Sequence, residues 1–180
     1  MRILGIDPGS AITGYGVVEA RGARLRCVAH GTLAPPRCAE LPARLAALHA
    51  ALQEVIGDHA PDGVVVEQVF VAASPRSALV LGQARGVALA AAAASGLPVY
   101  EYGPRTIKLA VAGSGVAAKA EVQRMVEALL ALGARPVPDA ADALAAAICH
   151  LRAAALPRGA ARGRSRSRGR RAPRFALRMA

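Results

Sequence analysis

The chain has 180 residues, of which 54% are hydrophobic and 3% aromatic, and its formal net charge is +11. This length supports one domain with a buried core, and the apolar content excludes an intrinsically disordered chain. Residues 157–180 carry nine Arg and no Asp or Glu, and removing these charges from the total leaves +2 for residues 1–156. We expect a folded domain over residues 1–156, a flexible Arg/Gly/Ser-rich tail over residues 157–180, and a polyanion such as nucleic acid as partner.

The cysteines and the apolar runs indicate the cellular compartment. Cys27, Cys38 and Cys149 show no C-x-x-C spacing, which argues against a disulfide framework or a zinc site and favours a reducing environment. Asp7 comes too early for a signal peptide, and the apolar run from residue 86 to residue 99 is too short to cross a bilayer. These features predict a soluble cytoplasmic protein.

Three strands are expected to open the chain as a β-meander, over residues 2–7, 13–20 and 25–33. Apolar residues at three- and four-residue spacing then predict a helix over residues 39–57, which Gly57 should end. The other elements expected, in chain order, are a buried strand 64–66 ending at Glu67, a helix 75–95, a strand 97–102, helices 104–112 and 118–132, and a last helix from Asp139 to about residue 154.

This order of elements predicts an α/β fold in which helices flank a mixed five-stranded sheet. The first three strands should be antiparallel, with the first strand central and the strand 64–66 beside it. Asp7 and Glu67 would then be neighbours, because each follows an apolar strand that ends abruptly.

Asp7 and Glu67 each have a structural and a chemical interpretation. Asp7 begins Asp-Pro-Gly, which often only caps a turn, and Glu67 could end its strand by pointing to water. Alternatively, both carboxylates are held rigidly at strand ends to bind a metal ion or a phosphate. A Glu that follows a buried Val run needs such a reason, because burying an unpaired charge is expensive.

Asp139 and Asp142 are three residues apart at the start of the last helix, so they share a helix face. Acidic residues are favoured at helix N-termini, and Asp139 has the position of an ordinary N-cap. That explanation is weaker for Asp142, which lies deeper in an alanine-rich helix.

Four carboxylates that converge would repel one another unless a cation lies between them. Oxygen ligands suit Mg²⁺ or Mn²⁺, and two such ions about 4 Å apart clamp the attacking and leaving oxygens of a phosphodiester. Convergence of the four acids would therefore indicate hydrolysis by a metal-activated water, without a His or Cys nucleophile. Four histidines show no metal-ligand spacing and are expected to be structural or surface residues: His30, His49, His59 and His150.

Five motifs follow one another along about residues 3–152. They are D-P-G-S-x-x-T-G-Y-G from Asp7, V-E-Q-V-F from Val66, L-G-Q-A-R-G-V-A from Leu81, K-x-x-V-Q-x-M-V from Lys119 and D-A-A-D-A-L-A-x-A-I from Asp139. Together they resemble the RuvC family of bacterial Holliday junction resolvases, which have the RNase H-like fold. The resemblance implies a homodimer that nicks two strands of like polarity, symmetrically, at a four-way DNA junction. It also implies 5′-phosphate ends that ligase can seal, and work alongside the RuvA and RuvB branch-migration proteins.

Carried over position by position, the resemblance implies two Mg²⁺ ions per active site, for which Mn²⁺ could substitute. The catalytic and metal-binding acids would be Asp7, Glu67, Asp139 and Asp142. Lys108 and Lys119 fall at the family's basic positions near the scissile phosphate, and they are the only lysines in an Arg-rich chain. Alternatively, these lysines lie by chance on solvated helix faces.

The resemblance also implies DNA contacts outside the acids. Phe70 would stack on a base exposed at the junction core. Alternatively, Phe70 is a residue of the hydrophobic core, which composition alone would favour. Arg76 and Arg85 are further DNA-binding candidates. Residues 71–76 depart from the family pattern, which commonly has a Lys-Asn pair near Ala73-Ser74, so base preference near the cut stays open. The tail lies outside the resemblance and either adds salt-sensitive phosphate binding or reflects codon bias.

Three other functions agree with part of the pattern. A phosphotransferase of the actin and sugar-kinase superfamily uses a similar glycine-rich hairpin, but needs two lobes and a longer chain. A non-catalytic nucleic-acid-binding module would explain the basic tail but not the four acids. Another RNase H-like nuclease, acting on hybrids or linear duplex, would explain the acids but not the full motif set.

Overall fold

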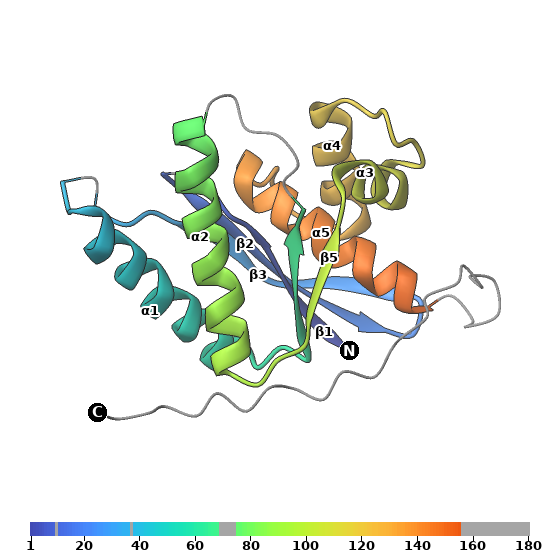
Figure 1. The fold of residues 1–180 in the computed structure, drawn as a ribbon. Coiled ribbons are helices and arrows are strands. Elements are labelled where there is room, and N and C mark those ends of the chain that lie inside the picture. Colours follow the sequence, from blue (N-terminus) through green and yellow to red (C-terminus); the bar gives the residue numbers. More distant parts are fainter. Residues whose placement is uncertain (10, 37, 69–74, 156–180) are drawn as a thin grey trace, which may run out of the picture.

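The computed structural model describes residues 1–9, 11–36, 38–68 and 75–155, which form one sheet with helices on both faces (Figure 1). The predicted domain boundary at residue 156 and the tail 157–180 lie outside these residues. The elements are, in chain order, β1 (Arg2–Asp7), β2 (Thr13–Arg21), β3 (Arg24–Leu33), α1 (Leu41–His59), β4 (Gly63–Glu67), α2 (Pro75–Ala94), β5 (Val99–Tyr102), α3 (Pro104–Ala112), α4 (Lys119–Leu129) and α5 (Pro138–Ala155).

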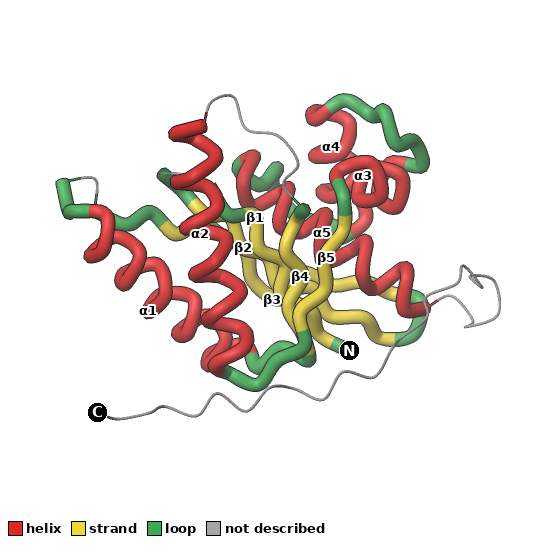
Figure 2. The backbone as a smooth tube through the Cα atoms, in the orientation of Figure 1, coloured by secondary structure: helices red, strands yellow, loops and turns green. Residues whose placement is uncertain are grey.

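The sheet has the strand order β3-β2-β1-β4-β5, so that β1 is central (Figure 2). The pairs β1–β2 and β2–β3 are antiparallel, whereas β4 runs parallel to β1 and β5 parallel to β4. The mixed five-stranded sheet predicted from the sequence is therefore confirmed, including the antiparallel first three strands and the neighbouring position of β4.

Side chains alternate between the two faces of the sheet, and each face has its own hydrophobic core. On β1, Ile3 is buried against α3, α4 and α5, whereas Leu4 is buried against α1 and α2. Val65 of β4 lies in the same core as Ile3. By this alternation Asp7 and Glu67 share the face that α5 covers (Figure 1).

The helix α5 lies unusually close to the sheet because glycines stand beneath it. A Cβ added at Gly5 would lie 1.9 Å from the carbonyl oxygen of Ala143, and one at Gly14 would lie 2.0 Å from that of Asp139. The side of α5 that meets them consists mainly of buried alanines. Small residues on both elements therefore bring the helix backbone into contact with β1 and β2.

Three expectations about helix ends are wrong, and one of them is that the helix expected over residues 118–132 is α4, which ends at Leu129. The helix α1 continues through Gly57 to His59, and it ends where Ala60 adopts a left-handed conformation (φ 40°) and donates its N–H to Ile56. Asp139 is not the N-cap of α5, because the helix begins at Pro138 and the first helical bond runs from the Ala141 N–H to the Val137 oxygen. Asp139 therefore lies in the first turn, where the helix dipole still favours a negative charge.

The helix α2 contains a segment, Ser77–Ala94, that is long and apolar enough to cross a membrane by length and composition alone. One side of it is buried in the core that α1 and β4 share, through residues such as Ala88 and Ala91. The only charged residue of the segment Ser77–Ala94 is Arg85, which forms an ion pair with Glu101 of β5. The apolar run considered in the sequence, residues 86–99, covers only part of this helix.

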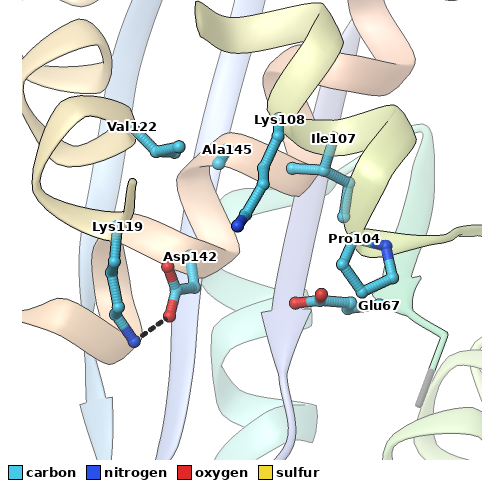
Figure 3. A pocket seen from close by; sticks show the side chains of 8 residues that line it. All are labelled: Glu67, Pro104, Ile107, Lys108, Lys119, Val122, Asp142 and Ala145. Atoms are coloured by element: carbon cyan, nitrogen blue, oxygen red, sulfur yellow. Dashed lines mark hydrogen bonds and ion pairs between the residues drawn. The ribbon is translucent and has the colours of Figure 1, made fainter. Parts of the chain in front are cut away.

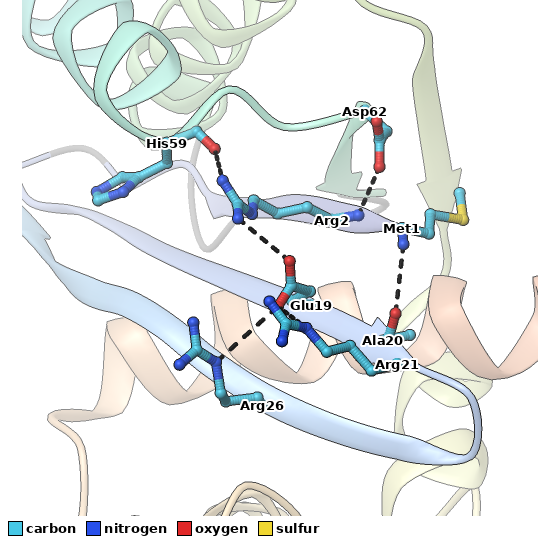
Figure 4. Close-up of polar contacts among 8 residues, drawn as sticks. All are labelled: Met1, Arg2, Glu19, Ala20, Arg21, Arg26, His59 and Asp62. Atoms are coloured by element: carbon cyan, nitrogen blue, oxygen red, sulfur yellow. Dashed lines mark hydrogen bonds and ion pairs between the residues drawn. The ribbon is translucent and has the colours of Figure 1, made fainter.

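The opposite end of the sheet from Asp7 is fastened by a polar network (Figure 4). Arg2 donates to the carbonyl oxygen of His59 at 2.5 Å and to Glu19 at 3.2 Å, and Arg21 donates to Glu19 at 2.8 Å. The Arg2 N–H donates to Asp62 at 2.6 Å. The network therefore ties β1 to β2 and to the turn before β4.

We expect Glu19→Gln to lower the thermal midpoint at pH 7 by about 2–4 °C. The hydrogen bond from Arg2 holds the pKa of Glu19 below its usual value, so its stabilising effect is present at neutral pH and is lost as the pH falls through that lowered pKa. The midpoints of the variant and the wild type should therefore converge in acid. The matched control is Glu127→Gln, which removes only an exposed pair with Arg135 and should leave the midpoint unchanged; equal effects of both changes would contradict this account.

Candidate active site

Two of the predicted acids meet at one edge of the sheet. Asp7 ends β1 and Glu67 ends β4, and these strands are parallel neighbours with Ile6 paired to Val66. Both carboxylates thus emerge at the same end of adjacent strands and on the same face. The predicted proximity of Asp7 and Glu67 agrees with this geometry.

The first turns of α5 bring the other two acids to the same edge. Asp139 and Asp142 lie three residues apart, and the backbone of Asp139 rests on Gly14. Gly14 is itself the β-pairing partner of Asp7. The missing side chain at Gly14 therefore allows the helix to carry Asp139 and Asp142 to Asp7.

The four acids interact through their charges. Burial raises the pKa of Asp7 to about 7, with further increases from the negative charges of Asp142, Glu67 and Asp139. Burial raises the pKa of Glu67 as well, and the charge of Asp142 adds to this, while Lys119 and Lys108 oppose it. Without a cation the cluster is therefore electrostatically unfavourable when fully ionised.

Both lysines of the chain face the acids across one cavity of about 180 Å³ (Figure 3). The Lys119 ammonium lies 2.6 Å from Oδ2 of Asp142, and this bond raises the pKa of Lys119. The amino group of Lys108 points into the cavity between Asp142 and Glu67 (Figure 3). The structure thus brings together two lysines and two of the acids, with Asp7 and Asp139 as electrostatic neighbours.

The acids fit a divalent cation by their chemistry, although they do not form a closed metal cage. Among the described residues, no three His, Cys, Asp or Glu side chains lie close enough together to hold a metal ion. Lys119 instead supplies the positive charge at Asp142. An all-oxygen donor set of carboxylates matches the hard cations Mg²⁺ and Mn²⁺, which also retain water and substrate oxygens as ligands.

In the absence of metal, the contribution of Asp7 to the stability of the protein should fall as the pH rises from about 4 to about 7. The folded state binds the Asp7 proton more tightly than the unfolded state does, because the pKa of Asp7 rises from 3.8 to about 7 on folding. We expect Asp7→Asn, which cannot ionise, to be about 1–3 kcal/mol more stable than the wild type at pH 8 without metal and to lose this advantage at pH 4. Denaturant titrations in EDTA measure the difference, and a constant difference across this pH range would contradict the coupling.

The other predicted DNA-binding residues are Phe70, Arg76 and Arg85, and none of them is described at the acids. Phe70 falls in residues 69–74, which are outside the described residues, and of Arg76 only the backbone, in the first turn of α2, is described. Arg85 pairs with Glu101, whose neighbours Tyr100 and Tyr102 pack on the α5 side of the sheet. By strand alternation Arg85 therefore lies on the face opposite the acids, and its role in DNA binding stays a prediction.

Sequence reasoning missed the glycines that seat α5 and the polar contacts that α5 makes. The sequence predicts a strand over residues 13–20 without a role for Gly14, although the alternation of Gly14 with Gly16 is a usable signal for a close approach on one face. Tyr102 and His150, whose side chains are hydrogen-bonded at 2.9 Å, are 48 residues apart and carry no motif.

Comparison with known proteins identifies the family of the chain. The family model described as crossover junction endodeoxyribonuclease RuvC matches residues 3–150. A crossover junction endodeoxyribonuclease RuvC from Alkalilimnicola ehrlichii is 57% identical over 150 residues, which cover 83% of this chain and 90% of the relative. The structure of Thermus thermophilus RuvC in complex with Holliday junction substrate superposes with a TM-score of 0.81 at 39% identity, covering 86% of this chain and 94% of that chain.

The fold class follows from these findings together with the sheet order. The chain has the RNase H-like fold, with Asp7 at the end of the central strand β1 and Glu67 at the end of its neighbour β4. A yeast mitochondrial Holliday junction resolvase shares the fold with a TM-score of 0.62 at 14% identity. More specifically, the chain belongs to the RuvC family, whose members are crossover junction endodeoxyribonucleases.

Proposed function

We propose that this protein resolves Holliday junctions by metal-dependent hydrolysis of two strands of like polarity, and that Asp7, Glu67, Asp139 and Asp142 hold the metal. The observation that carries the assignment of the acids is electrostatic. Burial and the neighbouring carboxylates raise the pKa of Asp7 to about 7, a cost that a divalent cation would offset. Metal dependence is a property of the family, and the oxygen donors favour Mg²⁺, with Mn²⁺ as a substitute.

When bound, two Mg²⁺ ions would supply an activated water and stabilise the leaving oxygen of the phosphodiester. The chain itself would contribute rigid placement of the acids, since Asp7 and Glu67 end paired strands and Asp142 is fixed on α5. Lys119 and Lys108 would contact the scissile phosphate from the cavity wall. A lysine ammonium is compact and flexible, which suits a crowded phosphate better than a planar guanidinium does.

The bond between Lys119 and Asp142 suggests how the site changes when it is loaded. The ammonium now lies 2.6 Å from a carboxylate that we assign to metal binding. With Asp142 engaged in metal binding, the Lys119 ammonium would be free to contact the phosphate of the DNA. The ion pair is therefore consistent with a site in which Lys119 stays beside the acids until DNA and metal bind.

We further propose the partners that the family resemblance implies. They are a second copy of the chain, a four-way DNA junction and the RuvA and RuvB branch-migration proteins, in the cytoplasm. Phe70 would stack on an exposed base, while Arg76, Arg85 and the Arg-rich residues 157–180 would add contacts to phosphates. Residues 1–156 would form the nuclease domain and residues 157–180 a separate basic tail.

The products of the reaction test this function. A synthetic four-way junction incubated with the protein and Mg²⁺ should yield two symmetric nicks with 5′-phosphate ends. DNA ligase should then restore intact strands without added kinase. Products that ligase seals only after treatment with a 5′-kinase would contradict the proposed chemistry.

A further inference from the structure

A partly buried hydrogen bond connects β5 to α5 on the active-site face of the sheet. The hydroxyl oxygen of Tyr102 lies 2.9 Å from Nδ1 of His150, whose exposed fraction is 5%. The Tyr100 ring covers the same imidazole with a centroid distance of 4.0 Å. The second ring nitrogen, Nε2, is buried and has no hydrogen-bond partner among the described residues. Tyr102 is therefore the one polar partner that the described residues give this imidazole.

One end of this hydrogen bond belongs to α5, which carries Asp139 and Asp142, and the other belongs to β5, which pairs with the strand that Glu67 ends. Tyr102 is the β-pairing partner of Glu67, and the N–H of Gln68 donates to the Tyr102 carbonyl oxygen at 2.9 Å. His150 lies on α5 about two turns after Asp142. The side-chain bond thus joins the strand pair that places Glu67 to the helix that places Asp142.

The packing between α5 and the sheet suggests that this hydrogen bond helps to set the position of the helix along its axis. Beneath the first half of the helix, Gly5 and Gly14 meet the backbone of α5, and many of the buried α5 residues are alanines, although the larger Leu144 and Ile148 are buried there as well. Glycine and alanine offer few interlocking side chains, so they resist sliding of a helix along its axis less than larger residues do. The hydrogen bond of 2.9 Å adds a directional constraint on the axial position of α5 relative to β5, beside the packing of Leu144 and Ile148.

We infer that Tyr102 and His150 are positioning residues that set the separation of Glu67 from Asp142 through this hydrogen bond. The inference rests on the proposed function, in which these two acids hold metal. It assigns no catalytic step to either residue, since neither lines the cavity at the acids.

The test is Tyr102→Phe, which removes the hydroxyl and keeps the ring. Calorimetric titration of the DNA-free protein with Mn²⁺ should show an affinity about 10-fold weaker than that of the wild type, the scale expected for loss of a group that orients a metal ligand. The Mg²⁺ concentration for half-maximal junction nicking should rise by a similar factor. The nicking rate at saturating Mg²⁺ should stay within about twofold, because the extra metal restores the same loaded site.

The matched control is Tyr100→Phe, which also removes one hydroxyl but leaves the ring on His150 and breaks no hydrogen bond that the structure assigns. Its metal affinity should equal that of the wild type. If Tyr102→Phe lowers only the thermal midpoint and leaves Mn²⁺ affinity unchanged, the bond is merely structural and the inference is wrong. Wild-type protein that neither binds Mn²⁺ nor needs a divalent ion for nicking would instead overturn the proposed metal site, and the inference with it.

Discussion

Replacing Asp7 by Asn is expected to reduce nicking of a four-way junction at least about 1000-fold and to leave junction binding within about twofold. Asp7 ends the central strand, and the pKa rise to about 7 comes from its burial and from the other three acids. The charge of Asp7 is therefore coupled to the charges of the other three acids. An amide keeps the shape but loses the charge that attracts a cation, while most contacts to DNA phosphates come from other residues.

Gel-based nicking assays and binding measurements in Ca²⁺ separate the two effects of Asp7→Asn. The control is Asp58→Asn, which removes an exposed carboxylate on α1, on the other face of the sheet. It should nick and bind as the wild type does. Nicking by Asp7→Asn at the wild-type rate in Mg²⁺ would show that the metal does not depend on this acid.

The second large effect is expected for Gly14→Ala. The added Cβ would lie 2.0 Å from the carbonyl oxygen and 2.3 Å from the carbonyl carbon of Asp139, so the helix backbone itself must move. We expect a loss of about 3 kcal/mol of stability and a loss of nicking of about 100-fold in the molecules that remain folded. The loss of activity follows because a shift of α5 moves Asp139 and Asp142 away from Asp7.

Denaturant titration and nicking assays well below the unfolding midpoint measure these two losses for Gly14→Ala. Gly57→Ala is the matched control, since an added Cβ there meets nothing within 4 Å and alanine is favoured within a helix such as α1. It should be as stable as the wild type or slightly more so, with full activity. Full activity in folded Gly14→Ala would mean that the close approach of α5 to β2 does not place the acids.

The sheet and the convergence of two acids could be predicted because both rest on local signals. An apolar run that stops at a carboxylate marks a buried strand with its chemistry at the end, and this holds for Asp7 and for Glu67. Helix ends were less predictable. The free energy that glycine costs inside α1 is smaller than the free energy gained by burying the residues around it. Gly57 is exposed, and Val55 and Ile56 beside it are buried, so packing carries the helix onward to His59.

Contacts between distant residues could not be predicted, for a different reason. Three such contacts depend on how α5 and α2 lie on the sheet. They are the ion pairs Lys119–Asp142 and Arg85–Glu101 and the hydrogen bond between Tyr102 and His150. No periodicity or spacing in the chain encodes that placement. The glycines beneath α5 do indicate where a helix backbone approaches the sheet. A glycine has no side chain, however, so this role is recognised only once the helix above it is known.

The central claim is that this chain cleaves four-way DNA junctions with a divalent cation held by its acids. The most direct measurement compares a synthetic four-way junction with a linear duplex of the same arm sequence, each with Mg²⁺ and with EDTA. The account predicts symmetric nicking of the junction in Mg²⁺, little cleavage of the duplex, and no cleavage of either substrate in EDTA. Equal cleavage of junction and duplex, or junction cleavage that persists in EDTA, would contradict it.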